Sequence, residues 1–87
     1  MKLEIRQSFA KDALKLPLNV QKEIAEIILL IENTEKLTEL RACKKLKGFK
    51  TAYRLRIGNY RIGFFFENNT IELVRILARK DIYRYFP

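Results

Sequence analysis

The stretch AYRLRIGNYRIGFFFENNTIELVRILAR, residues 52–79, decides the fold of this chain. Polar and apolar side chains alternate along it, with the period of β-strands, in three runs: Ala52–Ile57, Tyr60–Glu67 and Thr70–Arg79. Gly58-Asn59 joins the first two runs and Asn68-Asn69 joins the last two, and these residue types tolerate the positive φ angles of tight turns. The stretch therefore predicts a three-stranded antiparallel meander.

A strand and two helices are predicted before the meander. Residues Lys2–Gln7 alternate polar and apolar side chains, which indicates a half-buried strand. Ser8 is a helix-capping residue type, and a short helix is expected over Phe9–Leu16. Pro17 suits the first turn of a second helix, because the N–H group that proline lacks would have no partner there. This helix should run to about Asn33, with an apolar stripe of Val20, Ile24, Ile27, Ile28 and Ile31.

The remaining segments are less regular. Residues Thr34–Lys50 are expected to form a turn of helix and a loop that ends near Gly48. The tail, Lys80–Pro87, is expected to be a short helical turn or an extended end packed by Ile82 and Phe86. A chain of 87 residues has room for only one hydrophobic core. The prediction is a single α+β domain, residues 1–87, with the order β-α-α-β-β-β and a short C-terminal segment.

Strand alternation also predicts an arginine cluster on one face of the sheet. Arg54 and Arg56 lie on the side of their strand opposite the apolar residues, and Arg61 of the next strand is expected beside them. Gly63 should leave a gap near Arg61 that backbone or a nucleotide base can approach. On the third strand, one face is expected to contain Ile71, Leu73, Arg75, Leu77 and Arg79. The arginine face is predicted to be open, because the two helices cover the other side.

Positive charge is concentrated in the second half of the chain. Residues 1–40 contain six Lys and Arg against seven Asp and Glu, whereas residues 41–87 contain twelve against three. Between residues 41 and 66 there is no acid, and the cations are Arg41, Lys44, Lys45, Lys47, Lys50, Arg54, Arg56 and Arg61. Such a surface attracts phosphate, which favours RNA or DNA as a partner. The alternatives are a solvated basic face, an acidic protein partner, or pairing of the arginines with Glu67 and Glu72, although two acids cannot neutralise the whole cluster.

Several kinds of chemistry lack the residues that they need. The chain has one cysteine, Cys43, and no histidine, so neither a transition-metal site nor a cysteine nucleophile activated by histidine is expected, and no cofactor is predicted. Cys43 is expected to be a small buried or half-buried residue. No apolar run is long enough to span a bilayer and no signal-peptide pattern is present, so no membrane contact is expected and the predicted compartment is the cytoplasm.

Three segments together resemble a known family. They are Leu46-Lys47-Gly48, the run YRLRIGNYRI over residues 53–62, and the run RKDIYR over residues 79–84. With the order of the predicted elements, they make the whole chain resemble the RelE/ParE superfamily of toxins from type II toxin–antitoxin systems. For RelE-like members the resemblance implies ribosome-dependent cleavage of mRNA without a metal ion. In that reaction a ribose 2′-hydroxyl attacks the adjacent phosphorus and expels the 5′-oxygen, leaving a cyclic phosphate.

The resemblance also implies roles for individual residues. The reaction needs a base for the 2′-hydroxyl, cations for the charge that grows on the phosphate oxygens, and an acid for the leaving oxygen. The matched catalytic residues are Arg61 and Arg56 on the scissile phosphate, Arg54 on the backbone, Lys80 in charge stabilisation or proton donation, and Tyr83 in base stacking or 2′-hydroxyl contact. Arg79 is an alternative match for the role of Lys80, and Tyr83 alternatively packs at the sheet edge. The further nucleic-acid contacts are Arg41, Lys44, Lys45, Lys47, Lys50, Arg79 and Arg84.

Two departures from the family pattern bear on activity. Many relatives read Leu-His-Arg-Lys where this chain has alanine at position 78, and Asp often stands where this chain has Asn59. Histidine can transfer protons near neutral pH, whereas alanine cannot and arginine holds its proton too tightly. The prediction is an endoribonuclease attenuated by Ala78, with a ParE-like DNA gyrase inhibitor or an inactive antitoxin-binding regulator as alternatives. The implied partners are a cognate antitoxin in an oligomeric complex, the ribosome and mRNA.

Overall fold

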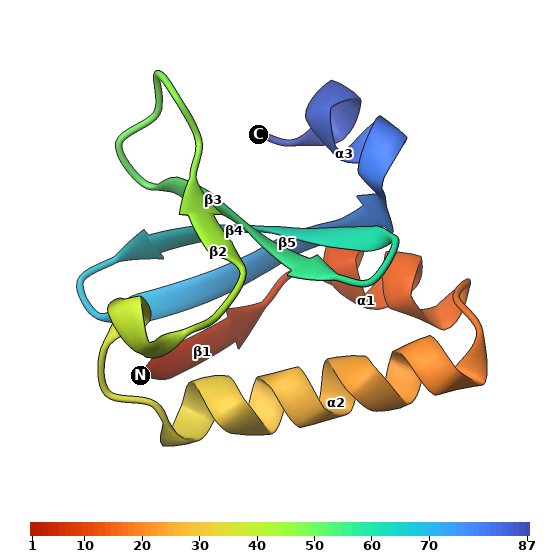
Figure 1. Ribbon diagram of the computed structural model, residues 1–87, viewed down its shortest axis with the longest axis horizontal. Helices are drawn as coiled ribbons and strands as arrows, with labels where there is room; N and C mark the ends of the chain where they lie inside the picture. The colour runs from red at the N-terminus through yellow and green to blue at the C-terminus, as the bar shows by residue number, and fades with distance from the viewer.

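A five-stranded sheet forms the centre of the structure, a computed structural model that describes residues 1–87 (Figure 1). Its strands are β1 (Lys2–Ile5), β2 (Cys43–Lys45), β3 (Ala52–Ile57), β4 (Tyr60–Glu67) and β5 (Thr70–Ala78). Their spatial order is β1-β5-β4-β3-β2, with β1 parallel to β5 and every other pair antiparallel. The predicted meander is confirmed, and its turns contain Gly58, Asn68 and Asn69 at φ angles between 53° and 56°.

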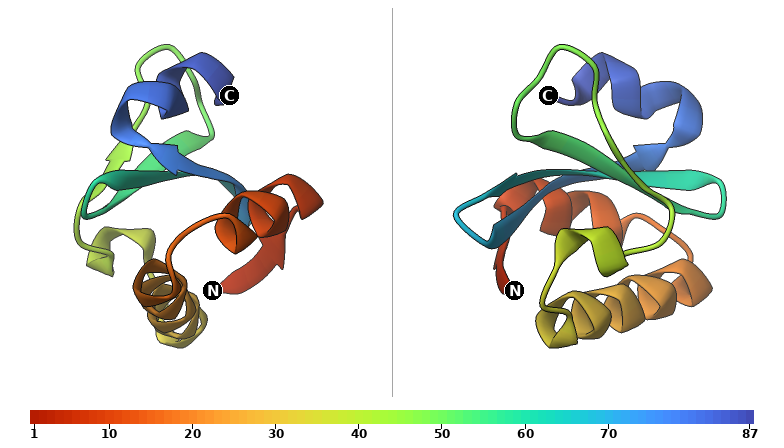
Figure 2. Two further views of the ribbon diagram at one scale, coloured as in Figure 1. Left: turned by 90° about the vertical axis from the view of Figure 1, so that its right-hand side faces the viewer. Right: turned by 60° about the vertical axis from the view of Figure 1, so that its left-hand side comes forward.

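The helices lie on both sides of this sheet. Helices α1 (Gln7–Leu14) and α2 (Leu18–Asn33) cover one face, and α3 (Arg79–Tyr85) covers part of the other (Figure 2). A single 3₁₀ turn, η1 (Leu37–Glu39), connects α2 to β2. No helix in the structure has the length and apolar character needed to cross a bilayer. The predicted α+β class is confirmed, and the predicted elements occur in the predicted order with β2 as an additional strand. The C-terminal segment is a helix rather than an extended end.

Two local predictions differ from the structure. The first helix begins at Gln7, and Ser8 is not its cap, because Ser8 lies within α1 and its Oγ donates to the Val74 carbonyl oxygen at 2.6 Å. Strand β2 lies inside the segment that was predicted as helix turn and loop, and it pairs with β3. Its three residues are too few to show the alternation of polar and apolar side chains that predicts a strand. The second helix ends at Asn33 as predicted, and it begins directly after Pro17.

The larger hydrophobic core lies between the sheet and helices α1 and α2. It contains twelve buried side chains, including Phe9 of α1, Ile24 and Ile31 of α2, and Phe64 of β4. Phe64 also stacks on Tyr53, with ring centroids 5.6 Å apart. Full burial of such side chains is the main source of folding free energy, at roughly 1.5–3 kcal/mol each. This core therefore fixes the position of β3, β4 and β5.

A second, smaller cluster lies on the opposite face under α3. It contains four buried residues, Ala52, Val74, Ile82 and Phe86. The Phe86 ring lies directly on Gly63, where an added Cβ would be 2.4 Å from the ring. The space beside Gly63 is therefore filled by Phe86, so the prediction of an open gap there is wrong. Packing by Ile82 and Phe86 is confirmed, and it attaches α3 to the sheet.

Strand β5 contains a β-bulge at Val74, because Gly63 and Phe64 of β4 pair with Arg75 and Leu73. The extra residue changes the alternation, so Val74 joins the cluster under α3 whereas Leu73 belongs to the larger core. The prediction that one face contains Ile71, Leu73, Arg75, Leu77 and Arg79 is therefore wrong. The apolar run gave no sign of this irregularity.

An ion pair attaches α1 to the bulged part of β5. Arg75 donates from Nε to Asp12 Oδ2 at 2.6 Å and from Nη2 to Asp12 Oδ1 at 3.1 Å, and the Ile76 N–H also donates to Oδ2 at 3.2 Å. The hydrogen bonds to Asp12 raise the pKa of Arg75 above its usual value. Tyr85 of α3 lies against the same guanidinium, with 5.6 Å from Cζ to the ring centroid. Arg75 thus joins α1, β5 and α3.

Candidate functional site

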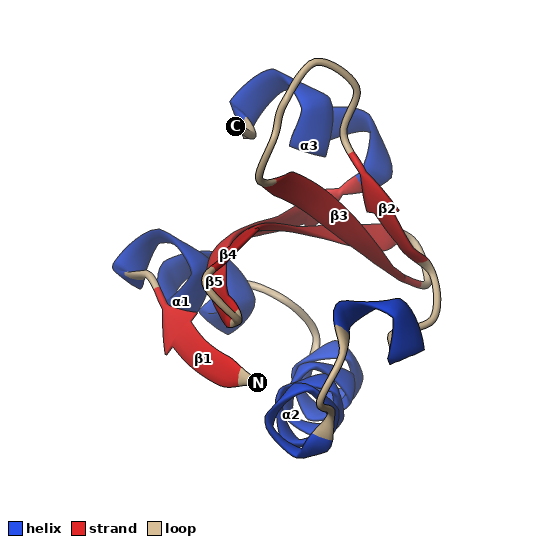
Figure 3. Cartoon of the chain, turned by 90° about the vertical axis from the view of Figure 1, so that its left-hand side faces the viewer, coloured by secondary structure: helices blue, strands red, loops and turns tan.

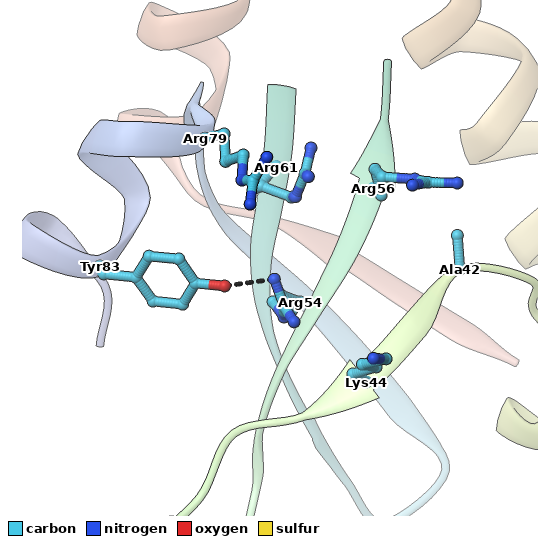
Figure 4. Close-up of a pocket in the computed structure, with 7 residues that line it drawn as sticks. All are labelled: Ala42, Lys44, Arg54, Arg56, Arg61, Arg79 and Tyr83. Carbon is cyan, nitrogen blue, oxygen red and sulfur yellow. Dashed lines mark hydrogen bonds between the residues drawn. The ribbon is translucent and has the colours of Figure 1, made fainter. Parts of the chain in front are cut away.

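A pocket of about 470 Å³ opens on the face of the sheet that α3 partly covers (Figure 4). We call it the basic pocket, and its lining residues are Ala42, Lys44, Arg54, Arg56, Arg61, Arg79 and Tyr83. Five of these seven side chains are cations, and none is an acid. The two ion pairs of the chain, Arg6 with Glu72 and Arg75 with Asp12, involve none of them. Pairing of the cluster with Glu67 or Glu72, the alternative left open by the sequence, does not occur.

The strand register places cations directly opposite one another. Lys44 of β2 pairs with Arg54 of β3, and Arg56 of β3 pairs with Arg61 of β4. Like charges in directly opposed positions destabilise a sheet. Two such pairs side by side, with no acid between them, form a local positive potential that only an anion from outside the chain can balance.

Arg61 is the most deeply placed of these cations, with 7% of its surface exposed. Its Nη1 donates to the carbonyl oxygens of Gly58 and Tyr60, each at 3.0 Å, so the β3–β4 turn holds the guanidinium in place. Its Nε is buried without a hydrogen-bond partner. Burial, and then the charges of Arg79, Arg54 and Arg56, lower the pKa of Arg61, while Tyr83 has the opposite effect. A bound anion would relieve both the desolvation and the repulsion.

Helix α3 brings Tyr83 to the edge of the basic pocket. Arg54 donates a hydrogen bond from Nη1 to the Tyr83 hydroxyl, and Figure 4 shows the phenol pointing at this arginine. Tyr83 is 55% exposed, so it does not serve as a packing residue of the sheet edge. Helix α3 also starts next to the pocket, because the Arg79 N–H donates to the Asn59 carbonyl oxygen at 3.0 Å.

Arg56 lies at the opposite side of the basic pocket. Figure 4 shows its guanidinium pointing away from Arg61 and Tyr83. It also lines a shallow hollow between α2 and the β3–β4 turn, together with Glu23, Glu26, Ile27, Leu30, Ile57 and Gly58. Arg54, Arg61, Arg79 and Tyr83 therefore form a compact group, and Arg56 would have to turn to join it.

Other residues predicted for the site lie around it. Lys80 is in a neighbouring shallow hollow that is lined by Asn59, Ala78, Arg79, Lys80 and Tyr83. Lys47 and Lys50 are on the loop between β2 and β3, and Lys45 is the last residue of β2. Arg41 is exposed before β2, and Arg84 lies beside Tyr85, 5.8 Å from Cζ to the ring centroid. Neither Arg41 nor Arg84 lines the basic pocket.

Comparison with known proteins identifies the fold. Residues 3–83 match the sequence family described as the ParE toxin of the type II toxin–antitoxin system parDE. The chain is also 42% identical, over 88 aligned positions and the full length of both proteins, to toxin RelE3 of Methanocaldococcus jannaschii.

The chain belongs to the RelE/ParE superfamily of type II toxins.

Solved structures of this superfamily have the same architecture as the present toxin. In the crystal structure of the RelB–RelE antitoxin–toxin complex from Methanococcus jannaschii, the matching chain is 39% identical with a TM-score of 0.83, and the match covers 97% of this chain and 99% of that one. The RelE–RelB complex from Pyrococcus horikoshii OT3 has 22% identity and a TM-score of 0.72, covering 90% and 93% of the two chains. At that identity the second match shows the fold alone.

Sequence reasoning missed two features of this toxin's pocket. Ala42 lines it at a φ of 58°, and its carbonyl oxygen accepts a hydrogen bond from the Arg56 N–H at 3.0 Å. Lys44 was assigned to nucleic-acid contact, but only its pairing in β2 brings it opposite Arg54. A positive φ at alanine is uncommon and has no sequence signal of the kind that Gly or Asn gives. The short run Cys43–Lys45 gave no signal either.

Proposed function

We propose that this toxin is an endoribonuclease that cleaves mRNA on the ribosome without a metal ion. The observation that supports this proposal most strongly is the basic pocket, which combines four arginines and one lysine with no acid and places Arg61 almost out of water. A phosphorane transition state has more negative charge on its oxygens than the starting diester. Cations that are already in place before the reaction stabilise that additional charge without reorganising.

In the proposed reaction the ribose 2′-oxygen forms a bond to phosphorus while the bond from phosphorus to the 5′-oxygen breaks. The 2′-hydroxyl proton passes to water, and the 5′-oxygen takes a proton from Lys80 or from water, so the products are a cyclic phosphate and a free 5′-hydroxyl. Arg61, held by the carbonyl oxygens of the β3–β4 turn, would contact the phosphate oxygens. Arg54 and Arg79 flank it, and Arg56 would turn inward when the substrate binds.

Tyr83 is proposed to contact the ribose or base next to the scissile phosphate. Its hydroxyl oxygen accepts the N–H of Arg54, so its own O–H proton is free to donate to the substrate. Lys80 lies in the adjoining hollow and would stabilise charge on the leaving oxygen or supply its proton. Both residues are on α3, so the position of this helix sets their distance from Arg61.

The attenuating effect of Ala78 can be tested directly. Ala78 precedes α3 and lines the same hollow as Lys80 and Tyr83. A histidine there would lie where protons must move, and positioned acid–base groups contribute about 10²–10⁴-fold. Ala78→His should therefore raise the cleavage rate at least about tenfold near neutral pH, whereas Ala78→Gln, of similar size but without a titrating group, should not. An Ala78→His rate equal to wild type would contradict this part of the proposal.

The main experiment is incubation of the purified toxin with translating ribosomes, followed by mapping of mRNA ends. New ends inside the decoding site, absent with Arg61→Met and retained with Lys22→Met, would support the proposal. Lys22 is an exposed cation of α2 and controls for the loss of one charge. No cleavage by the wild-type protein would overturn it.

A second candidate function follows from the matched family, which is described by the name of ParE. A ParE-like gyrase inhibitor would act by binding its target and would catalyse no reaction. It would need neither a proton-transferring side chain at position 78 nor a buried arginine at position 61. A DNA supercoiling assay with purified gyrase separates the two functions. Inhibition of supercoiling, without mRNA cleavage, would decide for this alternative, and the absence of both would indicate an inactive regulator.

A cognate antitoxin is the proposed partner in either case, because the similar structures from M. jannaschii and P. horikoshii are toxin–antitoxin complexes. Leu18, Leu29 and Leu30 of α2 are exposed, and an amphipathic antitoxin helix could cover them. An acidic antitoxin segment would fit the basic pocket. Copurification with the antitoxin, followed by light scattering, would test the association and the predicted oligomeric state.

A further inference from the structure

The loop between β2 and β3, residues 46–51, is fixed at its base. The Leu46 N–H donates to the Ala52 carbonyl oxygen at 2.9 Å, and the Phe66 N–H donates to the Thr51 carbonyl oxygen at 2.8 Å. Leu46 also packs against the small cluster under α3. Figures 1 and 3 show the loop projecting from the sheet on the same side as α3. Near the tip, the Phe49 N–H donates to the Leu46 carbonyl oxygen at 3.4 Å, and the loop lies next to the face that contains the basic pocket.

Phe49 at the tip of this loop is 49% exposed. It lines a shallow hollow together with Lys45, Leu46, Lys47, Gly48 and Lys50. The apolar anchor of the loop is Leu46, and Phe49 belongs to neither hydrophobic cluster. The three lysines take part in no ion pair. Packing therefore does not explain an aromatic ring at this position among three unpaired cations.

We propose that Phe49, Lys45, Lys47 and Lys50 form a second RNA subsite, in which an unpaired base stacks on the Phe49 ring and the lysines contact the adjacent phosphates. Proteins that bind single-stranded nucleic acids combine these two elements, aromatic rings for bases and cations for the backbone. An acidic protein segment would use the lysines but would supply a flat ring for Phe49 only where it also contains an aromatic residue, whereas every nucleotide has a base that can stack. The inference rests on the proposed function for its class of ligand.

The position of the loop fits a strand of RNA that also enters the basic pocket. Lys44 lines the basic pocket, and the next residue, Lys45, lines the hollow beside Phe49. Consecutive residues of a strand point to opposite faces, so RNA that contacts both lysines would pass around the edge of the sheet at β2. All residues of the hollow, and five of the seven that line the basic pocket, are on the part of the chain that contains no acid, residues 41–66. A single strand that crosses β2 would therefore meet positive charge throughout. The stacking site would hold nucleotides outside the scissile bond and add affinity without taking part in the chemistry.

The test measures binding of a fluorescent 2′-O-methyl oligoadenylate of about twelve nucleotides, which cannot undergo 2′-hydroxyl attack. Loss of one base stack lowers affinity by about 5- to 150-fold. Phe49→Ala should weaken binding by at least about fivefold, and Phe49→Trp should preserve or tighten it. Leu14→Ala, which removes an exposed apolar side chain from α1, is the matched control and should leave binding unchanged.

Salt dependence separates stacking from charge. Each phosphate contact of a single strand contributes a slope of about −0.7 in log K against log salt. Lys47→Ala should reduce the slope by about that amount, whereas Phe49→Ala should lower affinity with the slope unchanged. Oligonucleotide affinity of Phe49→Ala within twofold of wild type would overturn the proposal. An equal loss of affinity for poly-L-glutamate would overturn it too, because the loop would then recognise acidic chains in general.

The base could come from mRNA or from ribosomal RNA. Replacement of Phe49 by p-azidophenylalanine, followed by irradiation of the toxin on mRNA-loaded ribosomes, would identify the crosslinked strand. A crosslink to mRNA or to ribosomal RNA supports the subsite and names its source, and crosslinks to protein alone overturn it. Binding of the oligonucleotide does not require cleavage, so an inactive toxin with Phe49-dependent binding would reject the proposed enzyme and keep the subsite. Cleavage of mRNA together with oligonucleotide binding that does not depend on Phe49 would support the proposed enzyme and reject the subsite.

Discussion

The two faces of the central sheet differ in how much protein covers them. The face under α1 and α2 packs twelve buried side chains into one cluster, whereas the face under α3 packs four. The sparsely covered face contains the basic pocket, with Lys44 opposite Arg54 and Arg56 opposite Arg61. The comparison indicates that the face under α1 and α2 supplies most of the folding free energy. The other face contains opposed cations that destabilise the sheet unless an anion is bound. Substitutions on the two faces should therefore separate stability from activity.

The largest effect is expected for Phe64→Ala on the helix-covered face. Phe64 is 1% exposed, and deletion of a buried phenyl ring typically lowers the free energy of unfolding by about 3–5 kcal/mol. Phe86→Ala, the same change on the opposite face, should lower it by less than about 2 kcal/mol, because α3 can detach locally instead of leaving a closed cavity. Urea denaturation measures both. Equal losses of unfolding free energy would show that the two faces contribute equally to stability.

Arg61→Met should have the next largest effect, and on activity alone. Loss of one donor that stabilises a transition state reduces catalysis by about 10²–10³-fold. The free energy of unfolding should stay the same or rise, because methionine removes a desolvated charge and an unpartnered Nε. Ribosome-dependent cleavage assays and urea denaturation together test this. A marked destabilisation would show that Arg61 supports the fold rather than the site.

Gly63→Ala should act on the position of α3. An added Cβ would lie 2.4 Å from the Phe86 ring, so the ring and the helix that carries Tyr83 must move. Cleavage should fall at least about tenfold, as expected when catalytic groups shift by about 1 Å, while the larger core stays intact. Adding Phe86→Val to Gly63→Ala would return the space and should recover part of the activity. Full activity of the single variant would mean that the Phe86 contact does not position Tyr83.

The smallest effect concerns Cys43, on the edge strand β2. Burial raises the pKa of its thiol from 9.0 to about 11. Since the folded pKa is above the unfolded one, this group favours the folded state fully below pH 9 and loses that contribution as the pH rises toward 11. Alkylation by iodoacetamide at pH 8–9 should thus be slower in the folded protein than in urea. Equal rates would show that β2 does not shield the thiol.

The sequence predicted those parts of the fold that local patterns specify. Alternation and the Gly58-Asn59 and Asn68-Asn69 turns specified the meander, and Pro17 with the apolar stripe specified α2. Strand β2 was missed because three residues show no period. The bulge at Val74 was missed because the apolar pairs Leu73-Val74 and Ile76-Leu77 fit either face of the sheet. The filling of the Gly63 gap depends on Phe86, a contact between distant residues that no local pattern reveals.

The candidate site was predictable to a similar extent. Strand alternation placed Arg54, Arg56 and Arg61 on one face, and the family resemblance added Tyr83. The structure brings all four to the lining of one pocket. Lys80 was assigned to the catalytic set, but the first turn of α3 directs it to the adjoining hollow. The roles of these residues stay predictions until the variants are measured.

The parallel pairing of β1 with β5 has a consequence for biosynthesis. Leu3 lies opposite Ile71 and Ile5 opposite Leu73, so the first strand to leave a ribosome must wait for one of the last before it can join the sheet. Until β5 is available, β1 is translated but cannot join the sheet, and α3 has not been translated. We therefore expect that an unfinished chain exposes its arginines but cannot yet position Tyr83. If both are needed for the proposed cleavage, the protein becomes active only after release from the ribosome that makes it.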